Sequence, residues 1–318
     1  MEKLSFVIPC YGSELTIEGV LDEIHEVMAQ KPEYDYEIIC VNDCSPDGVL
    51  EVLKKRAGSD SKLTVLDLTK NMGKISAMLA GYSVVTGEYV VNLDDDGQCP
   101  VNELWRLLEP VESGYDVAFA GYPKKKQSAF KNLGSRVNAK MSSFLIGKPK
   151  DLITSNFSVM RRFIMDEMTK CNNLYFSGVL LKSTSKITNV CMEQRERAAG
   201  KSNFTFRKSL SILMYGLTGF SVVPLRISSV VGFITAMFGF FYGILIILRR
   251  LFFAPYIAAG FPSIMAAVLF IGGVIMLMLG MLGEYVGRIY ISLNNFPQYV
   301  IREVYRCPEE NLRHEEIT

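Results

Sequence analysis

Three consecutive aspartates, Asp94–Asp96, follow directly after an apolar run, Tyr89–Leu93. A carboxylate raises the free energy needed to ionise its neighbours, so three in succession are favoured when a positive charge lies among them. The run before them has the composition of a buried strand. The sequence therefore predicts a cation at the point where this strand ends.

Polar residues also follow three earlier apolar runs. Leu4–Pro9 leads into PCYGSE, Glu37–Val41 into NDCSPD, and Leu63–Asp67 into DLTKNMGK. Solvation alone does not explain acidic residues at the ends of several successive strands. We therefore expect these segments and the three aspartates to share one site.

The apolar runs alternate with stretches of helical periodicity, which are Thr16–Ala29, Val49–Arg56 and Lys74–Val85. This order predicts an α/β fold with a mostly parallel sheet and helices on both faces. Ligands on such sheets bind beyond the carboxyl ends of the strands. The polar segments fall at those ends, so the fold would bring them together.

The composition excludes several other classes of site. The chain has 318 residues, enough for a substantial core, and its formal net charge of +1 gives no indication of nucleic acid as a partner. Its seven scattered cysteines lack a paired CxxC spacing and are typical of reduced thiols. Two histidines, His25 and His314, do not readily assemble a zinc site or a Ser/His/Asp triad.

The C-terminal third of the sequence has the composition of membrane helices. Val230–Leu248 is 19 residues without a charge, which at ~1.5 Å per residue spans a bilayer core. A second uncharged stretch, Leu251–Gly283, contains Pro255 and Pro262 near its start, so we expect its helix at Ser263–Gly283. Two buried helices of a soluble core are the alternative.

Basic residues near the ends of these two spans predict their orientation. Most lie before the first span or after the second, and they are Lys201, Arg207, Lys208, Arg226, Arg288, Arg302 and Arg306. Arg249 and Arg250, in the short connection, are opposed to this pattern. The majority predicts that both termini are cytoplasmic, at the inner (plasma) membrane.

The expected organisation therefore has four parts. Residues 1–203 form a cytoplasmic α/β domain, residues 227–284 hold the two transmembrane helices, and residues 285–318 form a cytoplasmic tail. Residues 204–226 are apolar but carry Arg207, Lys208 and Arg226. They predict an amphipathic helix in the membrane interface, with a packed surface helix as the alternative.

Two common nucleotide-binding motifs are absent from the sequence. No G-x-G-x-x-G follows the first predicted strand, which argues against the usual dinucleotide fold. The GKS of Gly200–Ser202 is similar to the end of a phosphate loop, but position 195 is arginine where a Walker motif has glycine.

Five motifs nevertheless occur in an order found in a known family: FVIPCYGSE, VNDCSPD, KNMGK, LDDDGQCP and RAAGKSNF. With the two terminal apolar segments and LGEYVGRIY, they resemble the family 2 glycosyltransferases that attach sugars to polyprenyl phosphates. Dolichyl-phosphate mannose synthases and bacterial undecaprenyl-phosphate sugar transferases are of this kind. The resemblance covers essentially the whole chain. It implies a GT-A fold, a nucleotide-sugar donor with UDP as the expected nucleotide, a polyprenyl phosphate acceptor and a homo-oligomer, by resemblance a tetramer.

The resemblance gives the three aspartates a role as a D-x-D element. Asp94 and Asp96 would hold Mg²⁺ or Mn²⁺ against the diphosphate of the donor, with help from Gln98. Oxygen ligands suit hard divalent ions of this kind. Asp95 would lie nearer to the sugar or the ribose.

Other donor-binding residues follow from the same resemblance. Asp43 matches the aspartate that recognises the nucleoside, and Pro9, Tyr11 and Glu14 match positions that line the same pocket. The family often has Asn-Glu directly after the tyrosine, whereas this chain has Gly12 and Ser13 there, before Glu14. Lys74 would approach the diphosphate. The alternative for each is a strand-end or capping role.

The acceptor phosphate is expected to contact basic residues. Arg197 matches an arginine that relatives place before a Gly-x-Ser element, and a guanidinium group suits phosphate oxygens. Lys201 and Ser202 follow it, and Lys131 and Arg136 lie on a segment that approaches the lipid phosphate in relatives. Asp96 and Arg197 are therefore the expected catalytic residues.

The implied reaction is a single displacement at the anomeric carbon, in which the lipid phosphate attacks and the nucleoside diphosphate leaves. Some relatives carry an aspartate proposed as a general base where this chain has Asn156. A phosphate monoester has a second pKa of ~6 and is already largely ionised at neutral pH, so no base is required.

Two alternatives remain open from the sequence. A processive polysaccharide synthase on the same fold usually adds a Q-x-x-R-W element, whereas Gln194 here is followed by Arg195 and Glu196. A membrane-tethered regulatory domain would also gather aspartates at strand ends, but it has no evident use for GKSNF. The sequence does not indicate which sugar is transferred.

Overall fold

The computed structural model describes residues 1–122, 152–170, 176–193, 261–293 and 297–307, with single residues and short stretches between them. The chain forms two units. The first combines residues 1–206 with residues 297–318, and the second contains residues 207–296. The unit that contains the N-terminal part of the chain thus also contains the described residues 297–307.

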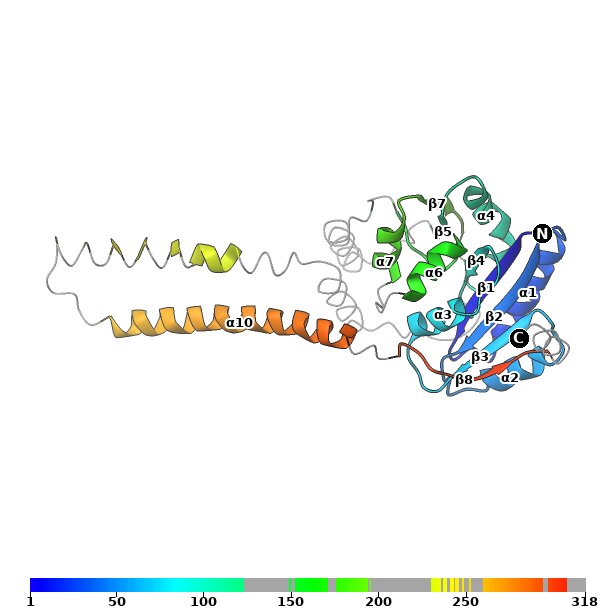
Figure 1. The fold of residues 1–318 in the computed structure, drawn as a ribbon, viewed down its shortest axis with the longest axis horizontal. Helices are drawn as coiled ribbons and strands as arrows, with labels where there is room; N and C mark the ends of the chain where they lie inside the picture. The colour runs from blue at the N-terminus through cyan, green and yellow to red at the C-terminus, as the bar shows by residue number, and fades with distance from the viewer. Residues whose placement is uncertain are drawn as a thin grey trace. The chain divides into compact units, whose positions relative to one another are not determined.

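An eight-stranded sheet forms the centre of the described part of the first unit (Figure 1). Its strands in chain order are β1 (Lys3–Cys10), β2 (Asp35–Asn42), β3 (Leu63–Leu68), β4 (Tyr89–Asn92), β5 (Val117–Gly121), β6 (Ser158–Arg161), β7 (Ile187–Cys191) and β8 (Ile301–Tyr305). They lie side by side in the order β7-β5-β6-β4-β1-β2-β3-β8.

The predicted α/β fold is confirmed, because β1 to β4 are parallel neighbours connected through helices. The sheet as a whole is mixed. β6 runs antiparallel to β4 and β5, and β8 runs antiparallel to β3. These two reversals bring the start of each reversed strand to the carboxyl ends of its neighbours.

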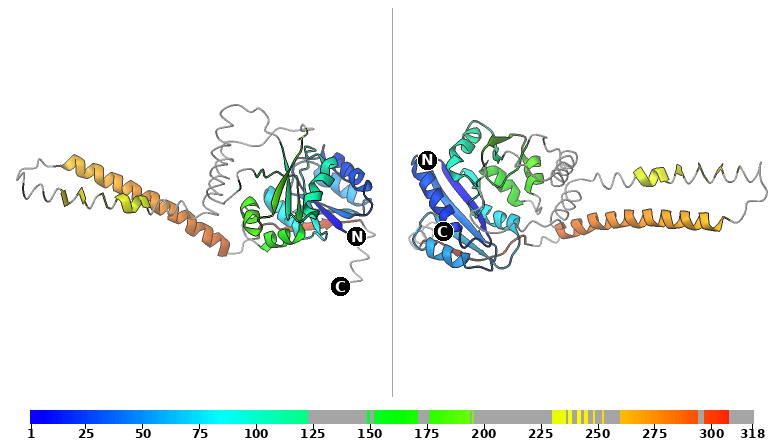
Figure 2. Two further views of the ribbon diagram at one scale, coloured as in Figure 1. Left: turned by 90° about the horizontal axis from the view of Figure 1, so that it is seen from above. Right: turned by 180° about the vertical axis from the view of Figure 1, so that it is seen from behind.

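Two layers of helices cover the sheet, as Figure 2 shows. The helices of the first unit are α1 (Ile17–Ala29), α2 (Val49–Ala57), α3 (Lys74–Tyr82), α4 (Leu104–Glu112), α6 (Arg162–Lys170) and α7 (Phe176–Ser183), and a 3₁₀ turn η1 (Val101–Glu103) precedes α4. α1, α2 and α4 share one core with alternate residues of β1, such as Phe6 and Ile8. α3 packs on the opposite face, against β1 and β2.

Gly81 allows α3 to lie close to the sheet. A Cβ atom at this position would be 2.5 Å from Cγ1 of Val7 and 3.3 Å from Cγ2 of Val41. Branched side chains within a buried sheet cannot move far without leaving voids, so a larger residue would displace the helix. The position of α3 affects the site directly, because its first residue is Lys74.

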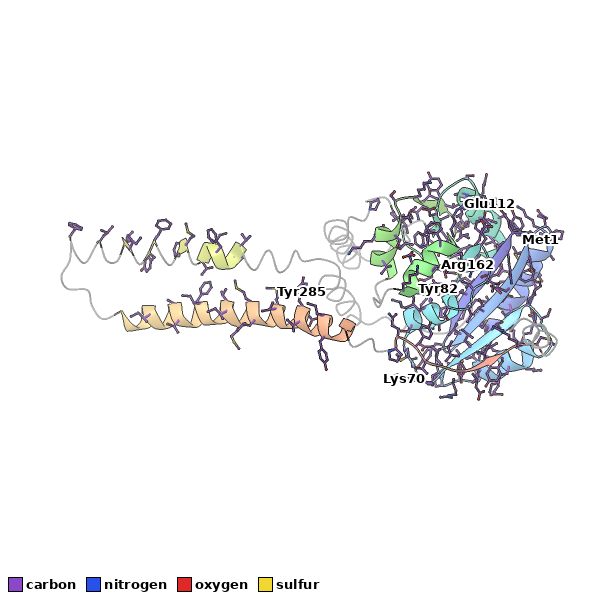
Figure 3. The ribbon with its side chains drawn as sticks, viewed as in Figure 1. Met1, Lys70, Tyr82, Glu112, Arg162 and Tyr285 are labelled. Atoms are coloured by element: carbon purple, nitrogen blue, oxygen red, sulfur yellow. The ribbon has the colours of Figure 1, made fainter. Side chains whose placement is uncertain are left out.

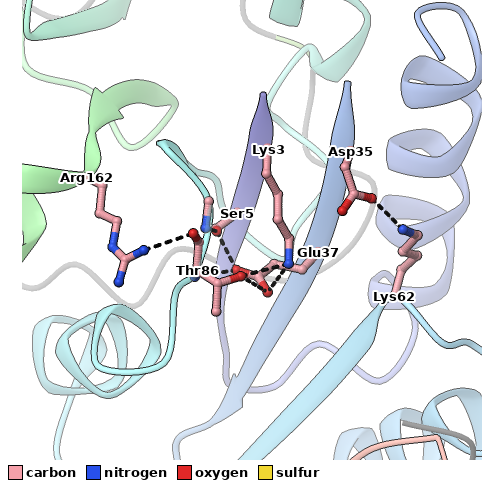
Figure 4. Close-up of polar contacts among 8 residues, drawn as sticks. Lys3, Ser5, Asp35, Glu37, Lys62, Thr86 and Arg162 are labelled. Atoms are coloured by element: carbon pink, nitrogen blue, oxygen red, sulfur yellow. Dashed lines mark hydrogen bonds and ion pairs between the residues drawn. The ribbon is translucent and has the colours of Figure 1, made fainter. Parts of the chain in front are cut away.

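A polar cluster joins β1, β2 and the turn before β4 near the amino ends of the strands (Figure 4). Glu37 accepts hydrogen bonds from Lys3 Nζ at 2.9 Å, Ser5 Oγ at 2.5 Å and the Thr86 backbone N–H at 2.6 Å. Arg162 donates to the Thr86 carbonyl at 2.9 Å. Burial opposes ionisation of Glu37, but the hydrogen bonds outweigh it and lower its pKa. The cluster stabilises the sheet at the end opposite to the predicted site.

The C-terminal segment differs from the predicted tail of residues 285–318. Helix α10 (Phe261–Leu293) extends past residue 284, and β8 then pairs with the edge strand β3. A strand of five residues is too short to be distinguished from a loop by its pattern alone, and its partner is distant in the sequence. Residues 301–305, which the sequence placed in the tail, are therefore part of the sheet.

The second unit, described by itself, contains α10, which begins at Phe261, two residues before the predicted Ser263, and ends at Leu293, past the predicted Gly283. Within the described residues one stretch, Phe270–Gly287, is long and apolar enough to cross a membrane. Several of its large side chains are exposed, among them Ile275 with 50% and Met276 with 71%. The first predicted span, residues 230–248, is described only in part, with residues 230–235 helical.

Candidate active site

The carboxyl ends of β1 to β4 meet at one edge of the sheet, as predicted. Figure 3 marks this edge by Lys70, which follows β3, and the opposite edge by Met1, which precedes β1. Contacts between the loops at this edge join all four strands, and six of the predicted site residues take part in them: Tyr11, Glu14, Asp43, Lys74, Asp94 and Asp95.

Asp94 is the second residue after β4, and its carboxylate contacts two donor groups. Lys74 Nζ forms an ion pair with Asp94 Oδ1, and Asn156 Nδ2 donates to Asp94 Oδ2 at 2.6 Å. Asn156 reaches this point because β6 is antiparallel to β4, with Ser158 paired to Asn92. The positive charge that the sequence predicts among the aspartates is therefore supplied in this structure by the Lys74 ammonium group.

Asp95 is directed toward the first loop. Its Oδ2 accepts the Tyr11 backbone N–H at 2.9 Å, and its carbonyl accepts Thr16 Oγ1 at 2.6 Å. Burial raises the pKa of Asp95, and the neighbouring charge of Asp94 acts in the same direction. These contacts fix the β1–α1 loop beside the aspartates, and the predicted approach of Asp95 to the sugar or ribose stays a prediction.

Asp96 and Gln98 form the turn that follows. Asp96 Oδ1 accepts the Gln98 backbone N–H at 3.1 Å, and Gly97 between them has φ +73°, a conformation that glycine adopts without strain. Gln98 Nε2 donates to the Arg195 carbonyl at 3.3 Å, and the Arg195 N–H donates to the Gln98 carbonyl at 3.3 Å. The amide nitrogen of Gln98 thus binds the segment that precedes Arg197.

Asp43 organises the β3–α3 loop. It is 4% exposed, and its two oxygens accept the backbone N–H groups of Met72 at 2.7 Å and Gly73 at 2.9 Å. Burial raises its pKa, and these two hydrogen bonds act against that rise. Gly73 has φ +86° and directly precedes α3. Asp43 therefore shapes this loop and fixes the residue that precedes Lys74, and its predicted contact with the nucleoside stays a prediction.

Glu14 also has a capping role. Its Oε2 accepts the Gly48 N–H at 2.9 Å at the start of α2, and a Cβ atom at Gly48 would lie 2.7 Å from Glu14 Oε1. Pro9 is buried within β1, paired with Val41. Tyr11, in contrast, is 47% exposed and accessible to a ligand.

The predicted acceptor residues are outside the part of the chain that the structure describes, and they are Lys131, Arg136, Arg197, Lys201 and Ser202. Arg195 is described, and it donates to Glu23 Oε2 at 2.8 Å and to Asn102 Oδ1 at 2.5 Å. Sequence reasoning did not find these contacts, nor the bond from Asn156 to Asp94. No local pattern indicates them, because each joins residues far apart in the chain.

Comparison with known families identifies the chain. Residues 5–169 match the family described as glycosyl transferase family 2, and residues 223–289 match the GtrB C-terminal hairpin. The chain belongs to glycosyl transferase family 2. The enzyme is a glycosyltransferase, as the five motifs predicted, and a purely regulatory domain is excluded.

Relatives of this family 2 glycosyltransferase align over almost its whole length. It is 31% identical to the SfII prophage-derived bactoprenol glucosyl transferase of Shigella flexneri, over 96% of this chain and 99% of that protein. It is also 31% identical to the undecaprenyl-phosphate 4-deoxy-4-formamido-L-arabinose transferase of Klebsiella pneumoniae (strain 342), over 99% of this chain and 98% of that protein.

The fold of this glycosyltransferase is GT-A. It is similar to that of mannosyl-3-phosphoglycerate synthase from Rubrobacter xylanophilus, with a TM-score of 0.50 and 19% identity, covering 71% of this chain and 74% of that one. At this identity the likeness concerns the fold alone. The predicted GT-A fold is therefore confirmed.

The chemistry of the site fits a divalent ion shared with a substrate. Among the described residues no three His, Cys, Asp or Glu side chains converge as a closed metal site. Mg²⁺, however, is commonly bound through one or two carboxylates together with substrate phosphates. Asp94 and Asp96 supply two such carboxylates, and Asp94 already holds a cationic group in the Lys74 ammonium.

Proposed function

We propose that this glycosyltransferase moves a sugar from a nucleotide sugar, with UDP as the nucleotide, to the phosphate of a polyprenyl phosphate such as undecaprenyl phosphate. The observation that carries the proposal is the presence of a family 2 domain and a GtrB-type hairpin in one chain. Two relatives that align over nearly the whole chain are named for bactoprenol and for undecaprenyl phosphate.

The loops after β1 to β4 are the proposed donor site. The exposed residue Tyr11 suits contact with the nucleoside, and Asp43 and Glu14 shape the loops on either side of it. Lys74 is the proposed contact of the diphosphate, since its ammonium group already lies among the aspartates. An ammonium group of this kind binds phosphate oxygens as a point charge.

Asp94 and Asp96 would hold Mg²⁺ or Mn²⁺ when the donor is bound. A divalent ion bound there would neutralise part of the negative charge that develops on the departing diphosphate. Asn156, through its hydrogen bond to Asp94 Oδ2, keeps that carboxylate oriented. Asp95 keeps the β1–α1 loop in place beside the pair.

The proposed reaction is a single displacement that inverts the anomeric configuration. The acceptor phosphate is already ionised at neutral pH, because its second pKa is ~6, and it needs no general base. Asn156 occupies the position where some relatives have an acid, and a neutral amide cannot take up a proton there. Arg197, with Lys131, Arg136, Lys201 and Ser202, remains the predicted set for the acceptor phosphate.

The membrane part is proposed to be a hairpin of two spans, residues 230–248 and α10, with the first unit in the cytoplasm. Gly232 supports this pairing, because a Cβ atom there would lie 2.8 Å from Met278 Cε of α10. Small residues allow close approach between membrane helices. Each CH₂ of a polyprenyl chain is worth ~0.8 kcal/mol when buried, so the acceptor stays in the bilayer and the enzyme must reach it there.

A transfer assay tests this proposal. The full-length protein in lipid nanodiscs is given undecaprenyl phosphate and Mn²⁺, with radiolabelled UDP-glucose, UDP-N-acetylglucosamine or a UDP-linked aminoarabinose in separate reactions. We expect the label of one donor to enter the organic phase only when the lipid phosphate is present. Equal labelling in nanodiscs without undecaprenyl phosphate would contradict the proposed acceptor.

A further inference from the structure

Arg302 brings a positive charge from the C-terminal strand to the carboxyl edge of the sheet. β8 is antiparallel to β3, so β8 begins where β3 ends. Arg302 Nη1 lies 3.5 Å from Asp67 Oδ2, and Nη2 donates to the Thr69 carbonyl at 3.0 Å. The guanidinium group thus contacts both the last part of β3 and the first residue of the loop that follows it.

Asp67 is a buried carboxylate that depends on these contacts. Its side chain is 4% exposed, and its Oδ1 accepts Asn42 Nδ2 at 2.7 Å. Among the described residues, Arg302 is the cationic partner of Asp67. A buried charge without a partner is strongly unfavourable, so Asp67 and Arg302 should maintain each other's position. The bond to Asn42 extends this contact to the residue directly before Asp43.

The β3–α3 loop is held at both ends. At its start, the Thr69 N–H donates to the Val300 carbonyl at 3.0 Å, and Arg302 Nη2 donates to the Thr69 carbonyl. At its end, the N–H groups of Met72 and Gly73 bind Asp43. The next residue is Lys74. Val300, directly before β8, and Arg302, within β8, therefore fix the start of the loop that leads to Lys74, the proposed diphosphate contact.

We propose that Arg302 is a positioning residue of the nucleotide site. Through Asp67 and Thr69 it fixes the β3–α3 loop, so that Lys74 is presented to the diphosphate. The inference rests on the proposed function, because it takes the loop to bind a nucleoside diphosphate. It also means that a strand encoded after the membrane helix belongs to the donor site, so a truncation before α10 would damage nucleotide binding as well as membrane attachment.

The test uses the full-length protein in detergent and two measurements on each variant. Hydrogen exchange followed by mass spectrometry reports on peptides that cover residues 67–74, and titration with UDP at saturating Mn²⁺ gives a Kd. The variants are Arg302→Ala and Arg302→Lys. Val304→Ala is the matched control, because Val304 is on the same strand and is 47% exposed.

In Arg302→Ala we expect faster exchange in residues 67–74 and a Kd for UDP raised about tenfold. Peptides that cover Tyr11 and Asp95 should exchange as in the wild type, because their mutual contact does not involve β8. Arg302→Lys keeps the positive charge but loses the planar guanidinium group with its two parallel donors. Its exchange in residues 67–74 and its Kd for UDP should therefore lie between those of the wild type and those of Arg302→Ala. It also serves as the test if Arg302→Ala fails to fold.

Three results would separate the possibilities. If both Arg302 variants match Val304→Ala in exchange and in Kd, the inference is overturned. If exchange in residues 67–74 rises while the Kd for UDP stays unchanged, Arg302 holds the loop without serving the nucleotide, and the positioning role is likewise overturned. If the wild type itself binds no UDP, the proposed donor fails, and the exchange measurement still decides whether Arg302 holds the loop.

Discussion

Replacing Lys74 by methionine should change metal binding and nucleotide binding in opposite directions. The ammonium group is paired with Asp94 Oδ1 in the structure, so an ion that uses this oxygen must displace it. Methionine keeps most of the apolar stem and removes the charge. We therefore expect tighter binding of Mn²⁺ to the donor-free protein and weaker binding of UDP once Mn²⁺ is present.

The exposure of the pair sets the size of the first effect. The side chains of Lys74 and Asp94 are 40% and 21% exposed, and partly exposed ion pairs contribute about 0.2–1 kcal/mol. The Kd for Mn²⁺ should therefore fall by a factor of roughly 1.4 to 5. The second effect should be larger, about tenfold in the Kd for UDP, because a charged hydrogen bond to phosphate is lost.

The electron paramagnetic resonance signal of free Mn²⁺ measures the first Kd, and calorimetry measures the second. Lys70→Met is the control, since Lys70 is exposed on the same loop and its loss changes the net charge equally. Weaker Mn²⁺ binding in Lys74→Met than in Lys70→Met would refute the view that Lys74 stands in the position of the metal ion.

Three further changes test other parts of the site and fold. Asp96→Asn should lower turnover at least ~100-fold, because one lost ligand costs several kcal/mol of charge stabilisation; full activity of this variant in excess chelator would rule out the metal assignment. Asn156→Ala should lower kcat less than about tenfold and weaken Mn²⁺ binding, since it loses a hydrogen bond to Asp94 but no general base; a hundredfold loss of kcat with unchanged Mn²⁺ affinity would indicate a direct chemical role. Glu37→Gln should lower the Tm at pH 7, and the difference from the wild type should shrink as the pH falls below about 4.5, the ordinary pKa of the group. The sign follows from the lowered pKa of Glu37 in the folded state, which gives stability above the unfolded pKa that is lost through the folded one; a Tm difference that stays constant to low pH in differential scanning fluorimetry would contradict it.

The N-terminal half of the fold could be predicted because its signals are local. The first four strands and α1 to α3 are found within a few residues of the predicted bounds, and each has a clear period in the sequence. The meeting of their carboxyl ends follows from parallel topology alone. Lys74 and Asp94 are therefore brought together as expected, although they are far apart in the chain.

Contacts made by reversed strands could not be predicted in the same way. β6 and β8 are short, and their direction depends on tertiary pairing rather than on their own composition. Asn156 and Arg302 reach the site only because these strands are antiparallel. The backbone contacts of Asp95 and Glu14 could not be predicted for another reason, since a motif shows that a carboxylate is present but not which backbone N–H group it accepts.

The identity of the released nucleotide tests the central claim most directly. The full-length protein in nanodiscs is supplied with undecaprenyl phosphate, Mn²⁺ and the UDP-sugar that it uses, and both the nucleotide and the lipid are identified by mass spectrometry. The account predicts one UDP for each lipid that gains a sugar on a single phosphate, because the lipid phosphate attacks the anomeric carbon. Release of UMP with a diphosphate-linked lipid, or of UDP with the lipid unchanged, would contradict it.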